Sequence, residues 1–417
     1  MIYRKRIQVY EHSFLRIGDR DFNTKHFIAL SKLNALHNYQ YFDLKHNGVV
    51  FKQFVGVLQV DNLTIEILPK IDRYEPEENK KKWQRVLIEM LHVTKKLKIQ
   101  QVGQANVAKQ SITLLDIYFE WFLNEVQLLV HQGLIKQYYK ETGNVKALKG
   151  KLEFAMHIQK NIVHKERFYT THQIYEKDHL IHQILGQALE IITRVSKGTY
   201  LYRRCKTVQV DFPEVTSIKA NESTFTKLIK SRKIAPYETA LSIARLIILN
   251  YAPNISNGSE RMLALLFDMN KLWEEYILVR LKQASIDHNI KVYGQNSKTF
   301  WSNISIRPDI VLENDDEKFI IDTKWKNIGN DKPSTHDLRQ MYVYNEYWKS
   351  NKSLLLYPSN NDDFHGYIRF GLLEGSDSQH HCGLGKVSIF KDCNKILNDQ
   401  IGAKILGWVT ESTSTNN

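Results

Sequence analysis

The first part of the chain alternates short apolar runs with turn-forming residues, a pattern typical of β-structure. Residues 55–60 and 63–69 are β-rich runs separated only by Asp61-Asn62, which predicts a hairpin with a tight polar turn. We therefore expect residues 1–75 to form a β-rich N-terminal domain.

Helical spacing of the apolar residues follows the charged segment 75–82. The pattern is largely helical over residues 83–140, most clearly at 111–131, and a second helical block is expected over 171–197. The sequence thus predicts a mainly helical region over residues 76–256.

A polar break at residues 256–259 is the preferred boundary of a third domain, 257–417. Behind the break, apolar residues at three- and four-residue steps predict a long helix over residues 260–283. Glu274 and Glu275 lie past the midpoint of this predicted helix.

Two apolar runs of strand length then flank an acidic turn at residues 313–317 and predict a second hairpin. Asp309 belongs to the first strand. Asp322 and Lys324 are two residues apart on the second strand, so their side chains point to the same face. A charged residue that closes a buried strand is costly unless it has a partner or a function.

A helix and a further strand are predicted downstream of this hairpin. Residues 336–348 predict a helix that starts behind Ser334 and places Gln340 and Tyr344 on one face. Residues 353–358 are typical of a buried strand. The order helix, strand, strand, helix, strand predicts a small α/β sheet with the acidic residues on its central strands.

The acidic residues of the hairpin, together with Lys324, indicate a site for a divalent cation. Two carboxylates and an ammonium that converge at a sheet edge can hold a hard divalent cation and polarise a water molecule beside it. That arrangement favours hydrolysis of phosphodiesters. The alternative is an ordinary hairpin with a solvated Asp309 and a salt bridge between Asp322 and Lys324.

Composition narrows the class of protein. The 417 residues are too many for one core, so two or three domains are expected. A net charge of +13 and a pI near 9.3 favour a polyanionic partner, because lysine and arginine displace counterions from phosphates. Three scattered cysteines give no disulfide framework, and no run approaches a membrane span or a signal-peptide core. We therefore expect a cytoplasmic protein without membrane association.

The chain resembles the PD-(D/E)XK restriction-fold nucleases at Pro308-Asp309, Asp322-Thr323-Lys324 and Gln340-x-x-x-Tyr344. More narrowly, it resembles the McrC family, the nuclease subunits of McrBC modification-dependent restriction systems. The segments that carry this resemblance keep their order along most of the chain: 65–71, 148–152, 166–169, 269–274, 307–310, 321–326 and 337–342. The resemblance implies an α+β or α/β multidomain protein. In such a protein a β-rich and helical partner-binding region precedes a mixed, restriction-endonuclease-like sheet flanked by helices.

The resemblance also implies roles for residues. Asp309 and Asp322 would bind a divalent cation, Mg²⁺ or Mn²⁺, and Glu274 would complete the metal shell, with Glu275 as the alternative. Lys324 would orient the attacking water and stabilise charge on the phosphate. Gln340 and Tyr344 on the following helix would steady the site or contact the DNA backbone. The predicted catalytic residues are therefore Asp309, Asp322, Lys324, Glu274, Gln340 and Tyr344.

A partner is implied as well. McrC-like chains dock on McrB-like AAA+ GTPase hexamers and stimulate GTP hydrolysis through their N-terminal region. This chain has no P-loop, since Gly150-Lys151 and Gly385-Lys386 both lack the upstream glycine, so GTP is expected only in the partner. The implied substrate is DNA, expected to be methylated, and recognition of the modified base is left to the partner.

Two alternatives remain at this point. A stand-alone or repair-type PD-(D/E)XK nuclease would carry the same catalytic strands. A non-cutting adaptor would activate the GTPase ring while its own site is degenerate. The intact set of Asp309, Asp322 and Lys324 argues against degeneracy.

Overall fold

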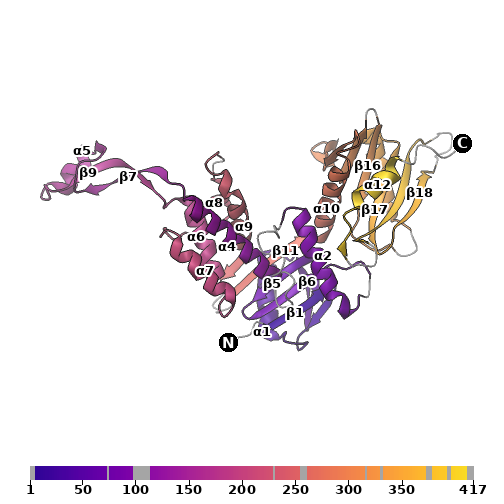
Figure 1. The fold of residues 1–417 in the computed structure, drawn as a ribbon, viewed down its shortest axis with the longest axis horizontal. Helices are drawn as coiled ribbons and strands as arrows, with labels where there is room; N and C mark the ends of the chain where they lie inside the picture. Colours follow the sequence, from indigo (N-terminus) through magenta and orange to yellow (C-terminus); the bar gives the residue numbers. More distant parts are fainter. Residues whose placement is uncertain are drawn as a thin grey trace. The chain divides into compact units, whose positions relative to one another are not determined.

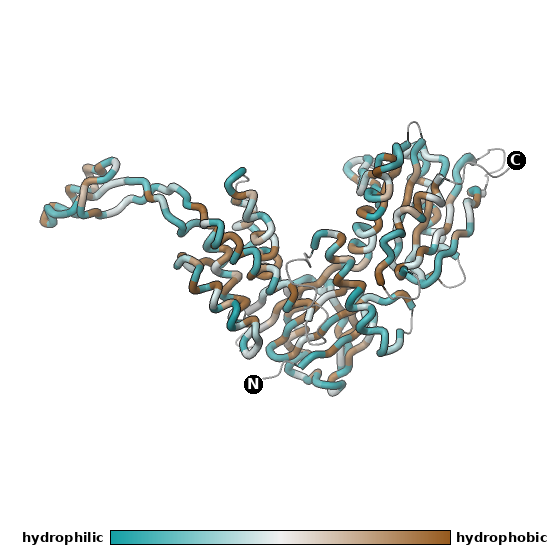
Figure 2. The backbone as a smooth tube through the Cα atoms, in the orientation of Figure 1, coloured by the Kyte–Doolittle hydropathy of each residue, from teal (hydrophilic) through white to brown (hydrophobic). Residues whose placement is uncertain are grey.

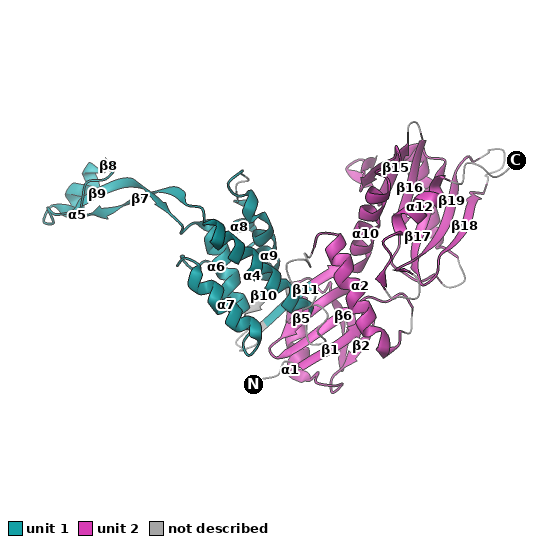
Figure 3. Ribbon diagram, viewed as in Figure 1, with its two compact units in different colours: residues 1–3, 99–265 teal, residues 4–98, 266–417 magenta. Residues whose placement is uncertain are grey.

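The computed structural model describes residues 5–72, 75–96, 113–228, 231–253, 261–314, 317–328, 332–371, 378–391 and 396–410. The chain forms two compact units (Figure 3): unit 1 contains residues 1–3 and 99–265, and unit 2 contains residues 4–98 and 266–417. Most of the predicted N-terminal and C-terminal domains fall in unit 2, and most of the predicted helical region falls in unit 1. The predicted break at 256–259 lies outside the described residues.

The N-terminal part of unit 2 contains strands and two α-helices. Its elements are β1 (Lys5–Tyr10), β2 (Phe14–Arg16), α1 (Thr24–Leu36), β3 (Phe42–Lys45), β4 (Gly48–Phe51), β5 (Phe54–Val60), β6 (Leu63–Leu68), the 3-10 helix η1 (Glu77–Asn79) and α2 (Lys80–Val93). The predicted hairpin is confirmed, because β5 and β6 pair antiparallel around a turn in which Asp61 has a φ of 49°. Strand β1 pairs parallel to β6.

The C-terminal part of unit 2 contains a mixed sheet and the helices around it. Its elements are α10 (Met269–Ala284), β12 (Lys291–Gly294), β13 (Lys298–Trp301), β14 (Ile304–Ile306), β15 (Ile310–Asn314), β16 (Glu317–Thr323), α11 (Thr335–Trp348), β17 (Lys352–Ser359), β18 (Asp363–Arg369), β19 (His381–Ser388), β20 (Phe390–Lys391), β21 (Ile396–Leu397) and α12 (Ile401–Thr410). The six-stranded sheet has the order β12-β15-β16-β17-β19-β18. The predicted hairpin, helix and following strand are thus confirmed as β15–β16, α11 and β17.

Helix α11 joins two parallel neighbours, β16 and β17, as a parallel connection requires. It buries Met341, Tyr344 and Trp348 against Ile320 and Leu355 of the two strands. On the sheet's other side, α12 brings Trp408 against Gly385 of β19, and α10 packs on α12. Hydrophobic segments accordingly run through the strands of this sheet (Figure 2). With both faces covered, polar side chains that lie on the sheet's strands are held in a fixed, low-dielectric setting.

The helix predicted over residues 260–283 is wrong in its first third. Residues Arg261–Asp268 form strand β11, which pairs antiparallel with β10 (Tyr251–Pro253), and the helix begins only at Met269. Asp268 caps α10, because its side chain accepts hydrogen bonds from the first turn of the helix. Glu274 therefore lies in the first half of the helix rather than past its midpoint.

Unit 1 combines helices with a three-stranded sheet (Figure 1). Its elements are α4 (Leu114–Gln132), β7 (Gln137–Val145), β8 (Lys151–Leu152), α5 (Phe154–Asn161), β9 (Phe168–Glu176), α6 (Leu180–Val195), α7 (Tyr200–Asp211), α8 (Glu222–Thr226), the 3-10 helix η3 (Ala235–Tyr237), α9 (Glu238–Leu249) and β10. The helix predicted at 111–131 is confirmed as α4 over its described part. The helical reading of residues 137–140 and 171–176 is wrong, because they belong to β7 and β9.

The structure confirms a mixed α/β protein of more than one unit. Within the described residues, no helix has both the length and the apolar character that a bilayer span requires.

Candidate active site

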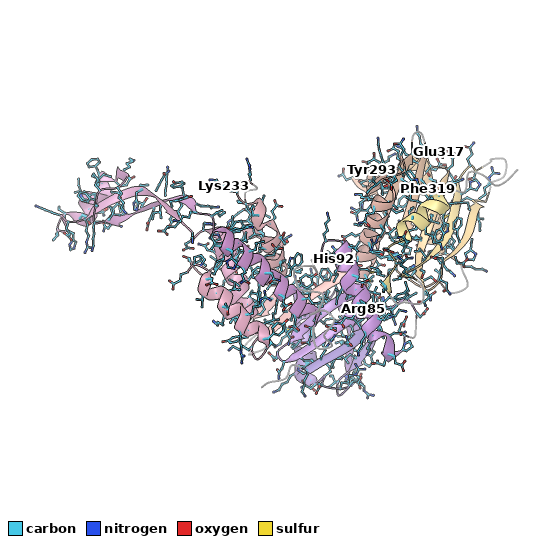
Figure 4. All side chains as sticks on the ribbon, in the orientation of Figure 1. Arg85, His92, Lys233, Tyr293, Glu317 and Phe319 are labelled. Carbon is cyan, nitrogen blue, oxygen red and sulfur yellow. The ribbon has the colours of Figure 1, made fainter. Side chains whose placement is uncertain are left out.

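The ends of β15 and β16 bring the predicted acidic residues together. Asp309 directly precedes β15, and Asp322 is the penultimate residue of β16. Lys324 follows β16, and its backbone N–H donates to the carbonyl of Leu356 on the neighbouring strand at 2.9 Å. Residues at the other end of β16, Glu317 and Phe319, are labelled in Figure 4. The site is therefore built where β16 leaves the sheet.

Asp309 is fixed by Thr323, the residue between Asp322 and Lys324. The Thr323 backbone N–H and its Oγ1 hydroxyl both donate to Asp309 Oδ2, at 2.7 and 2.9 Å. A carboxylate held by two donors on the neighbouring strand has one defined orientation, which leaves its other oxygen for a ligand.

Lys324 lies at the centre of the acidic residues. Its Nζ is 2.6 Å from Asp322 Oδ2, and it donates to Gln340 Oε1 at 3.4 Å. Asp337 Oδ1 lies at 3.9 Å from the same nitrogen. The prediction that Asp322 and Lys324 share a face is thus confirmed.

Helix α11 supports this lysine through the predicted glutamine–tyrosine pair. Gln340 Nε2 donates to Tyr344 Oη at 2.7 Å, and Tyr344 Oη donates to the backbone carbonyl of Arg307 at 2.9 Å. The chain of contacts runs from Lys324 through the helix to the segment before Asp309. In this structure the pair braces the site.

The two adjacent glutamates of α10 have different surroundings. Glu274 is buried, with 9% of its surface exposed, and its Oε1 accepts a hydrogen bond from Gln295 Nε2 at 2.7 Å. Glu275 instead forms an ion pair with Lys96 at 2.9 Å. The charge of Asp309 contributes to a raised pKa of Glu274.

Burial and mutual repulsion raise the pKa values of the carboxyl groups. Burial, with the nearby charge of Asp309, raises the pKa of Glu274 to about 7. Burial also raises the pKa of Asp309, although the hydrogen bonds from Thr323 oppose the shift. The pKa of Asp322 rises to about 6 through burial and the charge of Asp309. Lys324 stays protonated, because the surrounding carboxylates, Asp322 first, raise its pKa despite burial.

These side chains fit a magnesium-type cation in chemistry and number. Mg²⁺ prefers oxygen ligands, is often held by only one or two carboxylates, and keeps several waters. Burial and repulsion between the carboxylates disfavour their ionised forms even beside Lys324, and a divalent cation would favour those forms. Across the described residues, no group of three or more His, Cys, Asp or Glu side chains is arranged to hold a metal ion. Asp309 and Asp322 carry the oxygen ligands that such a cation prefers, and metal binding by these two residues and by Glu274 stays a prediction.

Several residues that shape the site were not predicted. Thr323 orients Asp309, Gln295 binds Glu274, and Asp337 accepts a hydrogen bond from Lys326 at 2.7 Å. Thr323 was identifiable in principle, because it stands between two predicted site residues. Nothing in the sequence pattern indicated Gln295, because its role depends on a contact with Glu274, 21 residues earlier in the chain.

Glu11 is a further unpredicted residue, and it comes from the N-terminal part of unit 2. It is fully buried, and its Oε1 accepts hydrogen bonds from Trp325 Nε1 at 2.7 Å and from the backbone N–H of Lys70 at 3.1 Å. Trp325 follows Lys324 directly, and its ring packs edge-on against Trp273, the neighbour of Glu274. Glu11 thus supports the backbone that carries the candidate catalytic lysine.

Comparison with known proteins relates this chain to a family. A family model described as McrBC 5-methylcytosine restriction system component matches residues 49–358. The type IV methyl-directed restriction enzyme EcoKMcrBC of Escherichia coli (strain K12) is 23% identical over 292 residues, which cover 65% of this chain and 80% of that relative.

Two solved structures share the fold. A refined half-complex from a tetradecameric assembly of Thermococcus gammatolerans McrB AAA+ hexamers with bound McrC matches with a TM-score of 0.71 and 19% identity, covering 97% of this chain and 100% of that chain. A cryo-EM structure of the Thermococcus gammatolerans McrBC complex matches with a TM-score of 0.52 and 20% identity, over 68% of this chain and 89% of that one. These matches confirm the predicted resemblance, and the family model covers most of the sequence. The chain belongs to the family of McrBC 5-methylcytosine restriction system components.

Proposed function

We propose that this protein is the DNA endonuclease subunit of a McrBC-like restriction system that acts on methylated DNA in the cytoplasm. The observation that carries the proposal is the meeting of Asp309, Asp322 and Lys324 where β16 leaves the sheet. The sheet with its flanking helices supports an assignment to the PD-(D/E)XK nucleases. Membership of the restriction-system family makes phosphodiester hydrolysis the chemistry to expect there.

The side chains of the site would divide the work of hydrolysis. Asp309 and Asp322 would hold Mg²⁺ or Mn²⁺. When bound, this cation offsets negative charge on the phosphate and lowers the pKa of a water molecule bound to it. Lys324, protonated and anchored by Asp322 and Gln340, would donate to the water and to a phosphate oxygen. The water oxygen bonds to phosphorus and releases a proton to solvent, one P–O ester bond breaks, and the leaving oxygen takes up a proton from solvent. Tyr344 would keep the lysine and the strand in place.

We further propose that the protein works with an AAA+ GTPase. Its sequence has no P-loop, whereas the matched Thermococcus structure contains McrB AAA+ hexamers with bound McrC. In this proposal GTP binds only in the partner hexamer. The partner supplies movement along DNA, and this chain supplies the cut.

A plasmid-cleavage assay tests both parts of the proposal. Purified protein is incubated with methylated or unmethylated plasmid and Mg²⁺, with and without the GTPase encoded by a neighbouring gene and GTP. Asp322→Ala is the test variant. Asp363→Ala is the matched control, because this aspartate lies on β18 of the same sheet with its side chain 49% exposed.

The outcomes separate the candidate functions. Cutting of methylated plasmid only with the GTPase and GTP, lost in Asp322→Ala and kept in Asp363→Ala, is the expected result. Cutting by the chain alone would instead identify a stand-alone nuclease. GTP hydrolysis stimulated by a chain that never cuts would identify an adaptor and overturn the catalytic assignment.

A further inference from the structure

The segment between β12 and β15 leaves the six-stranded sheet and returns to it at the candidate active site. At its start, Gln295 donates through Nε2 to Glu274, and its backbone N–H donates to the carbonyl of Asp309 at 2.9 Å. At its end, Arg307 and Pro308 lead directly into Asp309. Both ends of residues 296–308 are therefore fixed next to the candidate metal ligands.

The segment folds into the small hairpin β13–β14, a two-stranded sheet of its own. A register shift between Thr299 and Trp301 leaves Phe300 without a cross-strand partner and pairs Trp301 with Ile304 at the tip. Both tip side chains face solvent: Trp301 is 69% exposed and Ile304 is 55% exposed.

An exposed tryptophan is unusual in this chain. All seven tryptophans lie within the described residues, and Trp301 is the one whose side chain is mainly in solvent. Trp301 pairs across the hairpin with the exposed Ile304 and follows the exposed Phe300, and adjoining exposed apolar side chains mark interaction sites, whereas single ones do not. The tip of the hairpin is therefore a candidate interaction site.

The hairpin is braced against α11, so its tip has a defined position. The ring of Phe300 packs against Tyr347 with centroids 5.5 Å apart. Lys298 Nζ donates to the carbonyl of Tyr347 at 2.6 Å and lies 5.0 Å from the ring centroid of Trp348. These contacts attach the hairpin to the end of the helix that carries Gln340.

The base of the hairpin is positively charged. Lys298 begins β13 opposite Ile306 and is exposed. Arg307, which follows Ile306, is exposed at the same base. An apolar tip on a hairpin with cations at its base is complementary to DNA, in which the bases lie between two lines of phosphates.

We propose that the β13–β14 hairpin contacts the duplex DNA that is bound at the candidate active site, with Trp301 and Ile304 pressing against the bases and Lys298 against the backbone. The proposal rests on the nuclease function proposed above and adds the residues that would engage the substrate. DNA is favoured over a protein partner because the hairpin begins and ends at the catalytic carboxylates. An apolar side chain wedged between bases opens the local stack, and an aromatic ring can replace a base in it.

Binding of a fluorescently labelled methylated duplex to the full-length protein, without Mg²⁺, tests the proposal directly. Trp301→Ala should weaken binding about 5-fold to 100-fold, since stacking of one base on an aromatic ring is worth about that much. Trp301→Phe should restore most of the affinity. Ile368→Ala is the matched control, because this residue is 68% exposed on β18, at the other edge of the same sheet, and should bind like the wild type.

Quenching of tryptophan fluorescence by acrylamide gives a second readout. The exposed Trp301 should dominate the quenchable signal, and the duplex should protect it. Unchanged affinity of Trp301→Ala, together with full quenching in the presence of bound DNA, would overturn the proposal. Protection by the GTPase partner without DNA would overturn it as well, because the hairpin would then be a protein interface.

Cleavage assays keep this proposal separate from the nuclease assignment. If Asp322→Ala loses cleavage while Trp301→Ala binds and cuts normally, the nuclease proposal stands and the hairpin proposal fails. If the wild type never cuts but Trp301→Ala still weakens binding, the hairpin binds DNA and the nuclease assignment fails.

Discussion

Lys324 illustrates how a single residue organises the candidate site. Its ammonium is paired with Asp322, supported by Gln340 and close to Asp337, so it has several partners in a mostly buried setting. A structural role alone would be satisfied by one of these contacts. The carboxylates around the three N–H donors of the ammonium raise the pKa of Lys324 and keep it charged, as an electrostatic catalyst would need to be.

The variant Lys324→Met separates the charge of this lysine from its packing. We expect cleavage to fall by roughly 100-fold to 1,000-fold, the usual cost of removing one preorganised electrostatic contact from a transition state. Lys326→Met is the matched control, since Lys326 also pairs with Asp337 but has a 45% exposed side chain. Single-turnover cleavage with the partner and GTP measures the difference. Equal losses in the two variants would argue for a general effect of positive charge.

Glu11 makes a different prediction at the same scale, because it affects stability. Burial raises its pKa from 4.5 to about 7, against hydrogen bonds from Trp325 and Lys70. The folded state therefore favours the protonated form. The stabilisation from this group is fully present below about pH 4.5 and is lost as the pH rises through about 7.

The variant Glu11→Gln should remove this pH dependence. The amide oxygen can accept the same two hydrogen bonds without carrying a charge. Near pH 5 the variant should match the wild type, and at pH 8.5 it should be more stable, by an amount on the order of 3 kcal/mol at most. Urea unfolding at the two pH values measures this. A variant less stable than the wild type at pH 8.5 would show that the charge itself is needed.

At the scale of elements, the sequence predicted best where local pattern and tertiary environment agree. The β15–β16 hairpin has apolar runs on both sides of a polar turn, and α11 has a capping serine and an apolar stripe. Both elements formed where they were predicted. This local agreement is what placed Asp322, Lys324 and Gln340 correctly relative to one another.

The failures have identifiable physical causes. Strand β11 reads Arg-Met-Leu-Ala-Leu-Leu-Phe-Asp, and its leucines, alanine and methionine have high helix propensity. Pairing with β10 overrides that preference, and a sequence does not show its strand partners. Strand β7 is largely exposed and strand β9 is only partly buried, so they lack the apolar alternation that marks a half-buried strand. Glu11 was missed for a related reason, because its partner Trp325 is 314 residues away.

The cap of α11 gives a testable consequence at this scale. Ser334 accepts a hydrogen bond from the backbone N–H of Asp337 at 3.1 Å and so satisfies one of the free donors at the start of the helix. Ser334→Ala should lower the free energy of unfolding by about 1 kcal/mol, and Ser334→Asp should retain the wild-type value. Thermal or urea unfolding of the three proteins decides the matter. Identical stability of the alanine variant would mean that water replaces the cap without cost.

At the scale of the whole molecule, the candidate active site belongs to a unit made from both ends of the sequence. Trp83 of α2 packs edge-on against Phe390 with ring centroids 5.4 Å apart. Glu89 accepts a hydrogen bond from the backbone N–H of Leu397 at 3.2 Å, and Lys96 pairs with Glu275. Residues of the N-terminal part therefore complete the core around the mixed sheet.

A fragment of residues 257–417 should consequently fold poorly by itself. It would expose the surfaces that Glu11, Trp83 and Glu89 cover in the full chain. We expect rapid digestion by a protease and a broad unfolding transition, compared with slow digestion and a sharp transition for the full-length protein. Residues 4–98 supplied as a second polypeptide should increase resistance to the protease. A sharp transition of the fragment alone, near that of the full chain, would contradict this expectation.

The division of unit 2 into two stretches of sequence also has a consequence for synthesis in the cell. The ribosome must add residues 99–265 before the first stretch can meet the second, which takes roughly 10 to 30 seconds at ordinary rates of elongation. During that interval Trp83 and the other apolar side chains of α2 have no partner from the later stretch. Unit 1 is completed first, while the earlier stretch waits. We therefore expect chaperones to bind the apolar side chains of α2 in the nascent chain. Faster translation of residues 99–265 should increase the yield of folded protein.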